Sequence, residues 1–180
     1  MAIALDASVL SLWLSKRARA PIDPATEQPI AFARERIEKY IDSLKSRSER
    51  VVVPMPALAE VLSAGDADIS GIIDRLQKTS AFQLTAFGQR EALELAMINR
   101  QAIANGDKKG GLSAGWQKIK TDRQIVAIAK VANVTAFHTD DENAKTVAEQ
   151  VGLKVVRTIE LPYTPPPQLA LDLDDESADP

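Results

Sequence analysis

The amino-acid sequence predicts an α/β fold in which a parallel central sheet of about five strands is flanked by helices on both faces. Short segments rich in β-branched and other apolar residues alternate with longer segments whose apolar residues recur at helical spacing. This alternation is typical of repeated strand–helix units, which form parallel sheets. The expected strands lie near residues 2–5, 51–53, 82–85, 134–138 and 153–157.

The length and composition of the chain restrict the kinds of protein it can be. Its 180 residues, 45% hydrophobic and 26% charged, suit one globular domain. The chain has no cysteine and a single histidine, His138, which excludes disulfides, thiolate zinc sites and a metalloprotease HExxH site. Any metal must therefore be held mainly by oxygen ligands, which favours Mg²⁺ or Mn²⁺.

The ends of the chain predict a cytoplasmic protein with an acidic tail. The N-terminal MAIALDASVLSLWL lacks a basic leader, and no apolar run approaches the roughly 20 residues that cross a bilayer. We expect a domain over residues 1–160 and a proline-rich, then acidic tail over 161–180. Residues 171–180 carry five acids, so the 22 basic and 20 acidic residues that precede them leave a net charge of +2. This balance is compatible with a nucleic-acid partner.

The first strand, Ala2–Leu5, ends at Asp6 and is followed by a helix that includes Trp13 on its apolar side. A carboxylate at such a junction can cap the helix. If it is buried beside other acids, it can instead bind a metal ion. The next segment, from about residue 15 to residue 29, contains three prolines and predicts a loop, and residues 30–47 predict a long amphipathic helix.

The second strand, 51–53, precedes a helix over Ala57–Ala64 that contains Glu60. Most neighbours of Glu60 are apolar, and an ionised carboxylate among them is costly to bury unless a cation compensates it. The sequence is equally compatible with an exposed glutamate at the edge of the sheet.

The middle of the chain predicts a helix over 69–78, a strand at 82–85 and a helix over 89–103. The loop that follows, NGDKKGGLSAG, lacks the GxxxxGK[ST] spacing of a phosphate-binding loop. We expect it to be a linker, although a mobile loop that faces a substrate is an alternative.

The stretch from residue 120 to residue 141 predicts one helix that leads into one strand. Asp122 is expected at the start of the helix, and the strand 134–138 runs directly into Asp140 and Asp141. A helix over 142–151 and a last strand follow. Because ligands of α/β sheets bind at the carboxyl ends of the strands, these acids are candidates for a site.

Four acids thus stand at junctions between elements: Asp6, Glu60, Asp122 and Asp141. Capping can explain two of them, because both Thr121–Gln124 and Thr139–Glu142 match a capping box. It does not explain Glu60, nor why the acids gather at one predicted edge. Carboxylates brought together repel one another unless a cation neutralises them, and Mg²⁺ suits such a group. A bound metal ion activates water and stabilises charge on a phosphorane, which favours metal-assisted phosphodiester hydrolysis.

Three segments resemble the PIN domain, the nuclease fold of VapC-like toxins in bacterial toxin–antitoxin pairs. They are IALDASVL, VPMPALAEVL and TDRQIVAIAKVANVTAFHTDDENAKTVAEQVGLKVV, and together they cover most of residues 2–156. The resemblance implies a ribonuclease site that holds Mg²⁺ or Mn²⁺ with Asp6, Glu60, Asp122 and Asp141. Ser8 and Thr139 would orient the carboxylates. Asp140 is an alternative last ligand, although the family's spacing after the threonine selects Asp141.

The resemblance further implies a single-stranded RNA substrate, a small antitoxin protein as partner and a homodimer. Two features differ from a minimal toxin of this family. The segment from about 15 to 50 and the tail lengthen the chain, and Asn143-Ala144 stands where an aromatic residue usually follows the last acids.

Other classes fit the residues less well. A haloacid-dehalogenase-type phosphatase needs a second Asp where Ser8 stands, a receiver domain needs paired acids after the first strand, and a dinucleotide site needs GxGxxG. The alternative from a different class is a catalytically idle PIN-like module that binds RNA or a protein. We expect His138 to pack at its strand end, whereas Trp116, near Lys118 and Lys120, is a candidate for RNA contact.

Overall fold

The computed structural model describes residues 1–64 and 68–164, and it shows a single five-stranded parallel sheet within them. The order of the strands across the sheet is β3-β2-β1-β4-β5, and all four neighbouring pairs are parallel. The strands are β1 (Ala2–Leu5), β2 (Arg50–Pro54), β3 (Phe82–Thr85), β4 (Ala136–His138) and β5 (Val155–Val156). The predicted α/β fold is confirmed.

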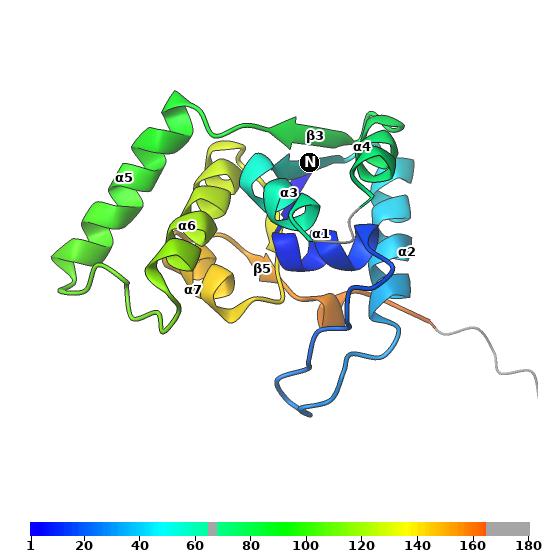
Figure 1. The fold of residues 1–180 in the computed structure, drawn as a ribbon, viewed down its shortest axis with the longest axis horizontal. Coiled ribbons are helices and arrows are strands. Elements are labelled where there is room, and N and C mark those ends of the chain that lie inside the picture. The colour runs from blue at the N-terminus through cyan, green and yellow to red at the C-terminus, as the bar shows by residue number, and fades with distance from the viewer. Residues whose placement is uncertain (65–67, 165–180) are drawn as a thin grey trace, which may run out of the picture.

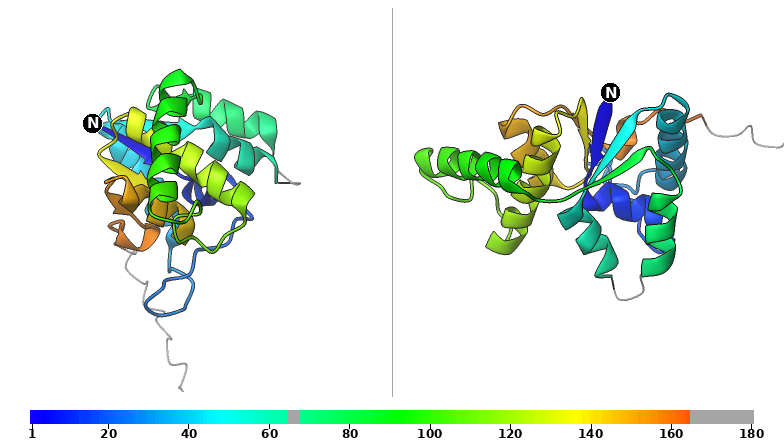
Figure 2. Two further views of the ribbon diagram at one scale, coloured as in Figure 1. Left: turned by 90° about the vertical axis from the view of Figure 1, so that its left-hand side faces the viewer. Right: turned by 90° about the horizontal axis from the view of Figure 1, so that it is seen from above.

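Helices cover both faces of this sheet (Figures 1 and 2). They are α1 (Ala7–Leu14), α2 (Ala33–Ser46), α3 (Met55–Leu62), α4 (Ile69–Gln77), α5 (Gln89–Ala104), α6 (Trp116–Val131) and α7 (Glu142–Gln150), with a 3-10 turn over Thr158–Glu160. None of the described helices is long and apolar enough to cross a lipid bilayer.

The alternation of side chains along the strands divides the core into two layers. Ile3 and Leu5 of β1 pack with α1, α2 and α4 on one face, whereas Ala2 and Ala4 pack with α6 and α7 on the other. Both faces of the central strand are therefore buried. This explains why β1 is apolar throughout, as expected of a strand covered by helices on both sides.

Helix α5 lies at the periphery, beyond α6 (Figure 1). Its contacts are mainly with α6, against which Ile98 and Ala102 are buried. Leu93, Met97 and Ile103, by contrast, are all more than 60% exposed. Helix α5 therefore packs on the outside of α6 and leaves an apolar part of its own surface exposed.

The start of α6 differs from the prediction. The helix begins at Trp116 after Gly115, so Asp122 lies in its interior and the capping box expected at Thr121 does not exist. The reason is Ile119, which is fully buried and extends the apolar face of the helix by one turn towards the N-terminus. The segment just before this turn is rich in glycine and lysine, which is typical of a loop, so the sequence predicted a later start for the helix.

The described part of the predicted tail, residues 161–164, packs on the domain. Leu161 is buried in the core, and the ring of Tyr163 stacks on Phe32 with 5.1 Å between their centroids. Packing therefore continues past residue 160. The acidic residues of the tail lie outside the described part of the chain.

The histidine ring is buried at the end of β4, as its position predicted. His138 is 1% exposed, and its Nε2 lies 3.2 Å from the Tyr40 hydroxyl. Burial, together with the positive charge of Lys154, lowers the pKa of His138 from 6.5 to about 4. The folded protein therefore holds this imidazole in its neutral form at neutral pH.

This burial predicts a loss of stability in acid. Between pH 7 and 4 the unfolded state takes up a proton on His138 near its ordinary pKa, while the folded state resists it, so the free energy of unfolding falls by roughly 3 kcal/mol. Urea unfolding at pH 7.5, 5.5 and 4 measures this, and His138→Gln should show a shallower fall. Tyr40→Phe, which keeps the titrating ring, is the control. Equal falls in the wild type and His138→Gln would contradict the prediction.

Candidate active site

The candidate site lies at the carboxyl ends of β1, the central strand of the sheet, and of its neighbour β4. Asp6 follows β1, and Thr139 to Asp141 follow β4. The chain leaves β1 towards β2 on one side, whereas β4 and β5 lie on the other side. Such a reversal of direction leaves a crevice at the strand ends, where ligands of α/β sheets bind.

Asp6 is buried and is held by two hydroxyl groups. Its Oδ2 accepts hydrogen bonds from Ser8 Oγ at 3.0 Å and from Thr139 Oγ1 at 2.8 Å. The Asp6 side chain does not cap α1. Burial raises the pKa of Asp6, and the negative charge of Asp141 adds to this effect, while the hydroxyl donors act in the opposite direction.

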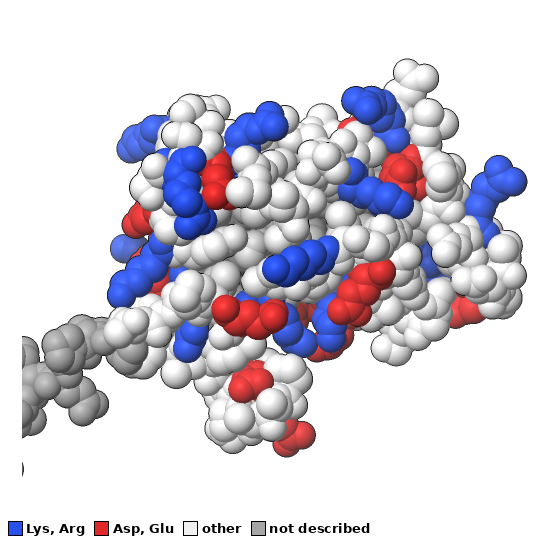
Figure 3. Space-filling model, turned by 180° about the vertical axis from the view of Figure 1, so that it is seen from behind, with Lys and Arg blue, Asp and Glu red and all other residues white. Residues whose placement is uncertain are grey.

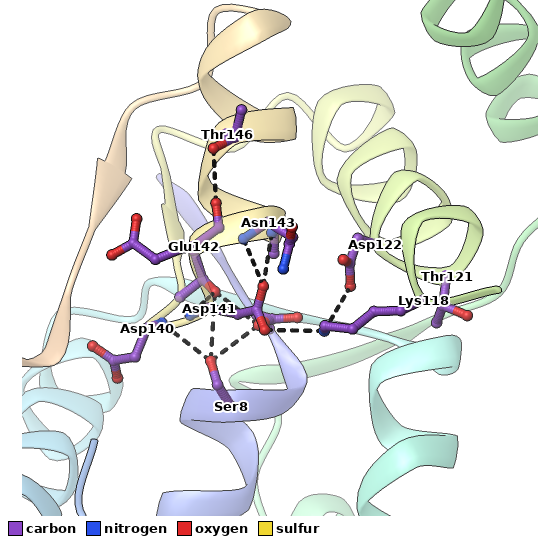
Figure 4. A network of polar contacts seen from close by, with 12 residues as sticks. Ser8, Lys118, Thr121, Asp122, Asp140, Asp141, Glu142, Asn143 and Thr146 are labelled. Atoms are coloured by element: carbon purple, nitrogen blue, oxygen red, sulfur yellow. Dashed lines mark hydrogen bonds and ion pairs between the residues drawn. The ribbon is translucent and has the colours of Figure 1, made fainter. Parts of the chain in front are cut away.

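The same two hydroxyls fix the backbone that follows β4. Ser8 Oγ accepts from the Asp140 amide at 3.1 Å, and Thr139 Oγ1 accepts from the Asp141 amide at 3.0 Å (Figure 4). Ser8 and Thr139 therefore connect the start of α1 to the turn before α7. These are the two hydroxyls that the resemblance implied would orient the carboxylates, and both donate to Asp6.

Asp141 caps α7 and also faces the site. Its Oδ1 accepts from the amides of Asn143 and Ala144 at 2.8 and 3.0 Å, and its Oδ2 lies 3.0 Å from Lys118 Nζ (Figure 4). Burial acts to raise the pKa of Asp141, but the two amides and the lysine outweigh it and lower the pKa. The capping box expected over Thr139–Glu142 is wrong, because Asp141 rather than Thr139 is the N-cap of α7.

Asp122 projects from the interior of α6 and is 2% exposed. One carboxylate oxygen lies 3.4 Å from Lys118 Nζ, and the other is buried without any hydrogen-bond partner. Burial raises the pKa of Asp122 to about 7, the charges of Asp141 and Asp6 act in the same direction, and Lys118 opposes them. An unpartnered buried carboxylate oxygen is costly, and such groups concentrate at functional sites.

Lys118 belongs to the site, which the sequence did not reveal. Its ammonium bridges Asp122 and Asp141 from the preceding turn of α6. Burial acts to lower the pKa of Lys118, but the two carboxylates outweigh it and raise the pKa. The i, i+4 spacing of Lys118 and Asp122 could have revealed this pair if the start of the helix had been placed correctly.

Glu60 reaches the same site from α3. It lines a cavity of about 300 Å³ together with Asp6, Ala7, Ser8, Ser11, Lys118 and Asp141. As a residue Glu60 is exposed, and loss of solvent around its carboxyl group and the charge of Asp6 raise its pKa. The structure therefore places Glu60 at an open edge, one of the two alternatives that the sequence allowed.

Asp140 does not join these acids. Its carboxylate accepts hydrogen bonds from the amide of Thr158 at 3.0 Å and from the Thr158 hydroxyl. This directs the side chain away from Asp141 (Figure 4). Of the two adjacent aspartates, Asp141 is the one that faces Lys118 and the cavity.

Comparison with known proteins identifies the fold. No protein-family model matches the sequence, and no curated protein matches it. A chain of the crystal structure of VapBC2 from Rickettsia felis bound to a DNA fragment from their promoter is similar in structure, with a TM-score of 0.55 and 12% sequence identity. The match covers 87% of this chain and 98% of that chain. The chain has a PIN-like fold.

The acids of this PIN-like fold suit a divalent metal by donor type, since all are oxygen ligands and Asp122 has an oxygen without a partner. They do not converge on one point, however. Among the described residues, no group of three or more acidic or histidine side chains is close enough to hold a metal ion. The Lys118 ammonium lies between two of them, so metal binding requires this side chain to withdraw.

The bridging position of Lys118 predicts that it competes with a metal ion. Lys118→Met should bind Mn²⁺ roughly tenfold more tightly than the wild type, because no ammonium then has to leave Asp122 and Asp141. Titration calorimetry measures the affinity, and Lys120→Met, an exposed lysine on the same helix, is the control. Unchanged or weaker binding by Lys118→Met would show that the lysine does not compete.

The two roles of Asp141 can be separated by substitution. Asn is as good a helix cap as Asp, so Asp141→Asn should keep the cap of α7, whereas Asp141→Ala should lose it. We expect Asp141→Ala to have a free energy of unfolding about 1 kcal/mol below that of Asp141→Asn in urea. If the two variants unfold at the same urea concentration, the cap contributes nothing measurable.

Proposed function

We propose that the protein is a metal-dependent endoribonuclease that hydrolyses phosphodiester bonds of single-stranded RNA. The observation that carries this proposal is the set of carboxylates around one open cavity, with a buried Asp122 oxygen that has no partner. A structural ion-pair network would pair its buried oxygens, whereas Asp122 keeps one buried oxygen without a hydrogen-bond partner.

In this proposal Asp6, Glu60, Asp122 and Asp141 hold Mg²⁺ or Mn²⁺. When bound, the ion would activate water and stabilise negative charge on the phosphate that is attacked. Ser8 and Thr139 keep the Asp6 carboxylate in one orientation through their hydrogen bonds to Oδ2. Lys118 supplies a positive charge beside Asp122 and Asp141, and its half-exposed side chain can turn towards the cavity when metal takes its place.

We further propose that the protein is the toxin of a toxin–antitoxin pair, that a small antitoxin protein binds it and that it forms a homodimer. The support is the similarity of fold to a chain of the VapBC2 structure. The order of the acids along the chain matches the PIN pattern and adds to this support.

A second function has an observation in its favour. Lys118 already neutralises part of the charge of Asp122 and Asp141, and the described acids do not form a ready metal-binding group. These two features are what we expect of a catalytically idle PIN-like module that binds RNA or a protein, because such a module needs no metal site. Such a module would keep the fold and the Asp6 network but would bind no divalent metal.

The test is cleavage of mixed single-stranded RNA by the pure protein with Mg²⁺, with Mn²⁺ and with EDTA. We expect cleavage only with metal, and a loss of roughly 100-fold or more in the double variant Asp6→Asn plus Asp122→Asn, because several kcal/mol of transition-state stabilisation depend on the bound ion. Both substitutions keep the shape of the side chain, and circular dichroism checks that the variant is folded.

The other outcomes separate the candidates. Absence of cleavage together with absence of Mn²⁺ binding by calorimetry would favour the idle module. Cleavage that persists in EDTA, or in the double variant, would contradict the carboxylate site.

A further inference from the structure

The segment of residues 15–31 stands beside the carboxylate cavity and is not used by the function proposed above. We propose that this segment forms a wall of the groove that holds the RNA strand next to the cleaved bond, and that Arg19 binds a phosphate of that strand. This inference rests on the proposed function, since it assumes that the substrate is a single strand cleaved at the carboxylates.

The first observation is a larger cavity that continues the one at the acids. It has a volume of about 600 Å³, within the range of ligand pockets, and shares Ser8, Ser11 and Asp141 with the smaller cavity. The rest of its lining comes from the 15–31 segment and from the residues around the end of β4, namely Ala18, Arg19, Pro21, Ile22, Pro24, Asp140, Glu142 and Arg157. A strand that lies across the carboxylates can therefore extend between α1 and the 15–31 segment.

The second observation is that this segment is built as a fixed wall. Ile22 and Pro29 form an antiparallel bridge, and the Asp23 amide donates to Gln28 O at 2.9 Å. Ile30 is buried in the core at the far end of the segment. The turn within it is closed by Asp23, whose carboxylate accepts from the Ala25 amide at 2.9 Å.

Arg34 of α2 fixes the start of the segment. Its guanidinium donates to the carbonyls of Leu12 and Ser15 and, at 3.4 Å, to that of Ala18. The backbone just before Arg19 is thereby attached to both α1 and α2. In Figure 1 the segment projects below these helices, and it needs no rearrangement to line a groove.

The third observation is the free charge of Arg19. Its side chain is exposed, and within residues 1–64 and 68–164 it has no hydrogen bond or ion pair. Arg157, on the other side of the cavity, is instead occupied by the Glu142 carboxylate and the Asp140 carbonyl. Arg19 is therefore the guanidinium of this cavity that is available to a phosphate, which it can bind with two parallel hydrogen bonds.

The surface beside Arg19 suits the rest of a nucleotide. Ile22 is 52% exposed and lies between Pro21 and Pro24 along the wall, so it offers an apolar face to a base or ribose. On the face of the molecule opposite to that of Figure 1, Lys and Arg side chains are interspersed with Asp and Glu (Figure 3). That face does not offer a continuous basic track that would compete for the strand.

The test compares a short and a long substrate. Arg19→Ala should lower kcat/KM for a 12-nucleotide single-stranded RNA roughly tenfold, mainly through KM, and leave kcat/KM for a dinucleotide unchanged. Arg19→Lys should recover part of the loss. Arg100→Ala, an exposed arginine on the distant α5, is the control.

A binding measurement provides a readout that does not depend on cleavage. In EDTA, fluorescence anisotropy with the same 12-nucleotide RNA should show a weaker affinity for Arg19→Ala. The slope of log affinity against log salt concentration should be smaller by about 0.7, as expected for one lost phosphate contact.

The outcomes distinguish this inference from the function on which it rests. If the wild type cleaves RNA but Arg19→Ala equals it in kcat/KM for both substrates and in RNA affinity, the inference about the groove is contradicted. The proposed nuclease function is then still supported. If the wild type neither cleaves nor binds RNA, the proposed function fails and this inference fails with it.

Discussion

The burial of carboxyl groups at the end of the parallel sheet is the constraint on which the site depends. An ionised carboxylate loses solvation when it is buried, so each one must find donors, a cation or a proton. Asp6 is stabilised by two hydroxyls, Asp141 by two helix amides and a lysine, and Asp122 by that lysine alone. The pKa of Asp122, raised to about 7, reflects how little compensation it receives. This unequal distribution makes Asp122 the acid that gains most from an added cation.

The hydroxyl bridges also connect the chemistry of the site to the fold. Ser8 lies in the first turn of α1, and Thr139 is the residue that follows β4. The two residues are 131 positions apart in the chain. Because β1 and β4 are neighbours in the sheet, the ends of both strands meet where these two side chains bind Asp6 and the following backbone. Any shift of register between the two strands would break this network, so the sheet order and the geometry of the site depend on the same pairing.

Much of the fold and part of the site could be predicted from the sequence, because they depend on local periodicity. The strands, the helices with a clear apolar face and the position of Asp6 followed from that periodicity. The start of α6 could not be predicted, because Ile119 is recognisable as a core residue only when the rest of the core is known. The role of Lys118 was missed for the same reason. The spacing of the PIN resemblance favoured Asp141 over Asp140, but the contact that turns Asp140 away could not be predicted, since Thr158 lies 18 residues further along the chain.

The opposite directions of Asp140 and Asp141 explain how the site can extend into a larger groove. In extended backbone, successive side chains point to opposite sides, so the turn after β4 sends Asp141 to the carboxylates and Asp140 to Thr158. Arg157 then neutralises Glu142 at the edge of the larger cavity. Lys118 pairs with Asp141, and Thr158 donates to Asp140, so Arg19 is the charged side chain in the lining of this cavity that has no partner among the described residues. The 15–31 segment therefore places the charge of Arg19 next to the cavity that shares Asp141 with the acids.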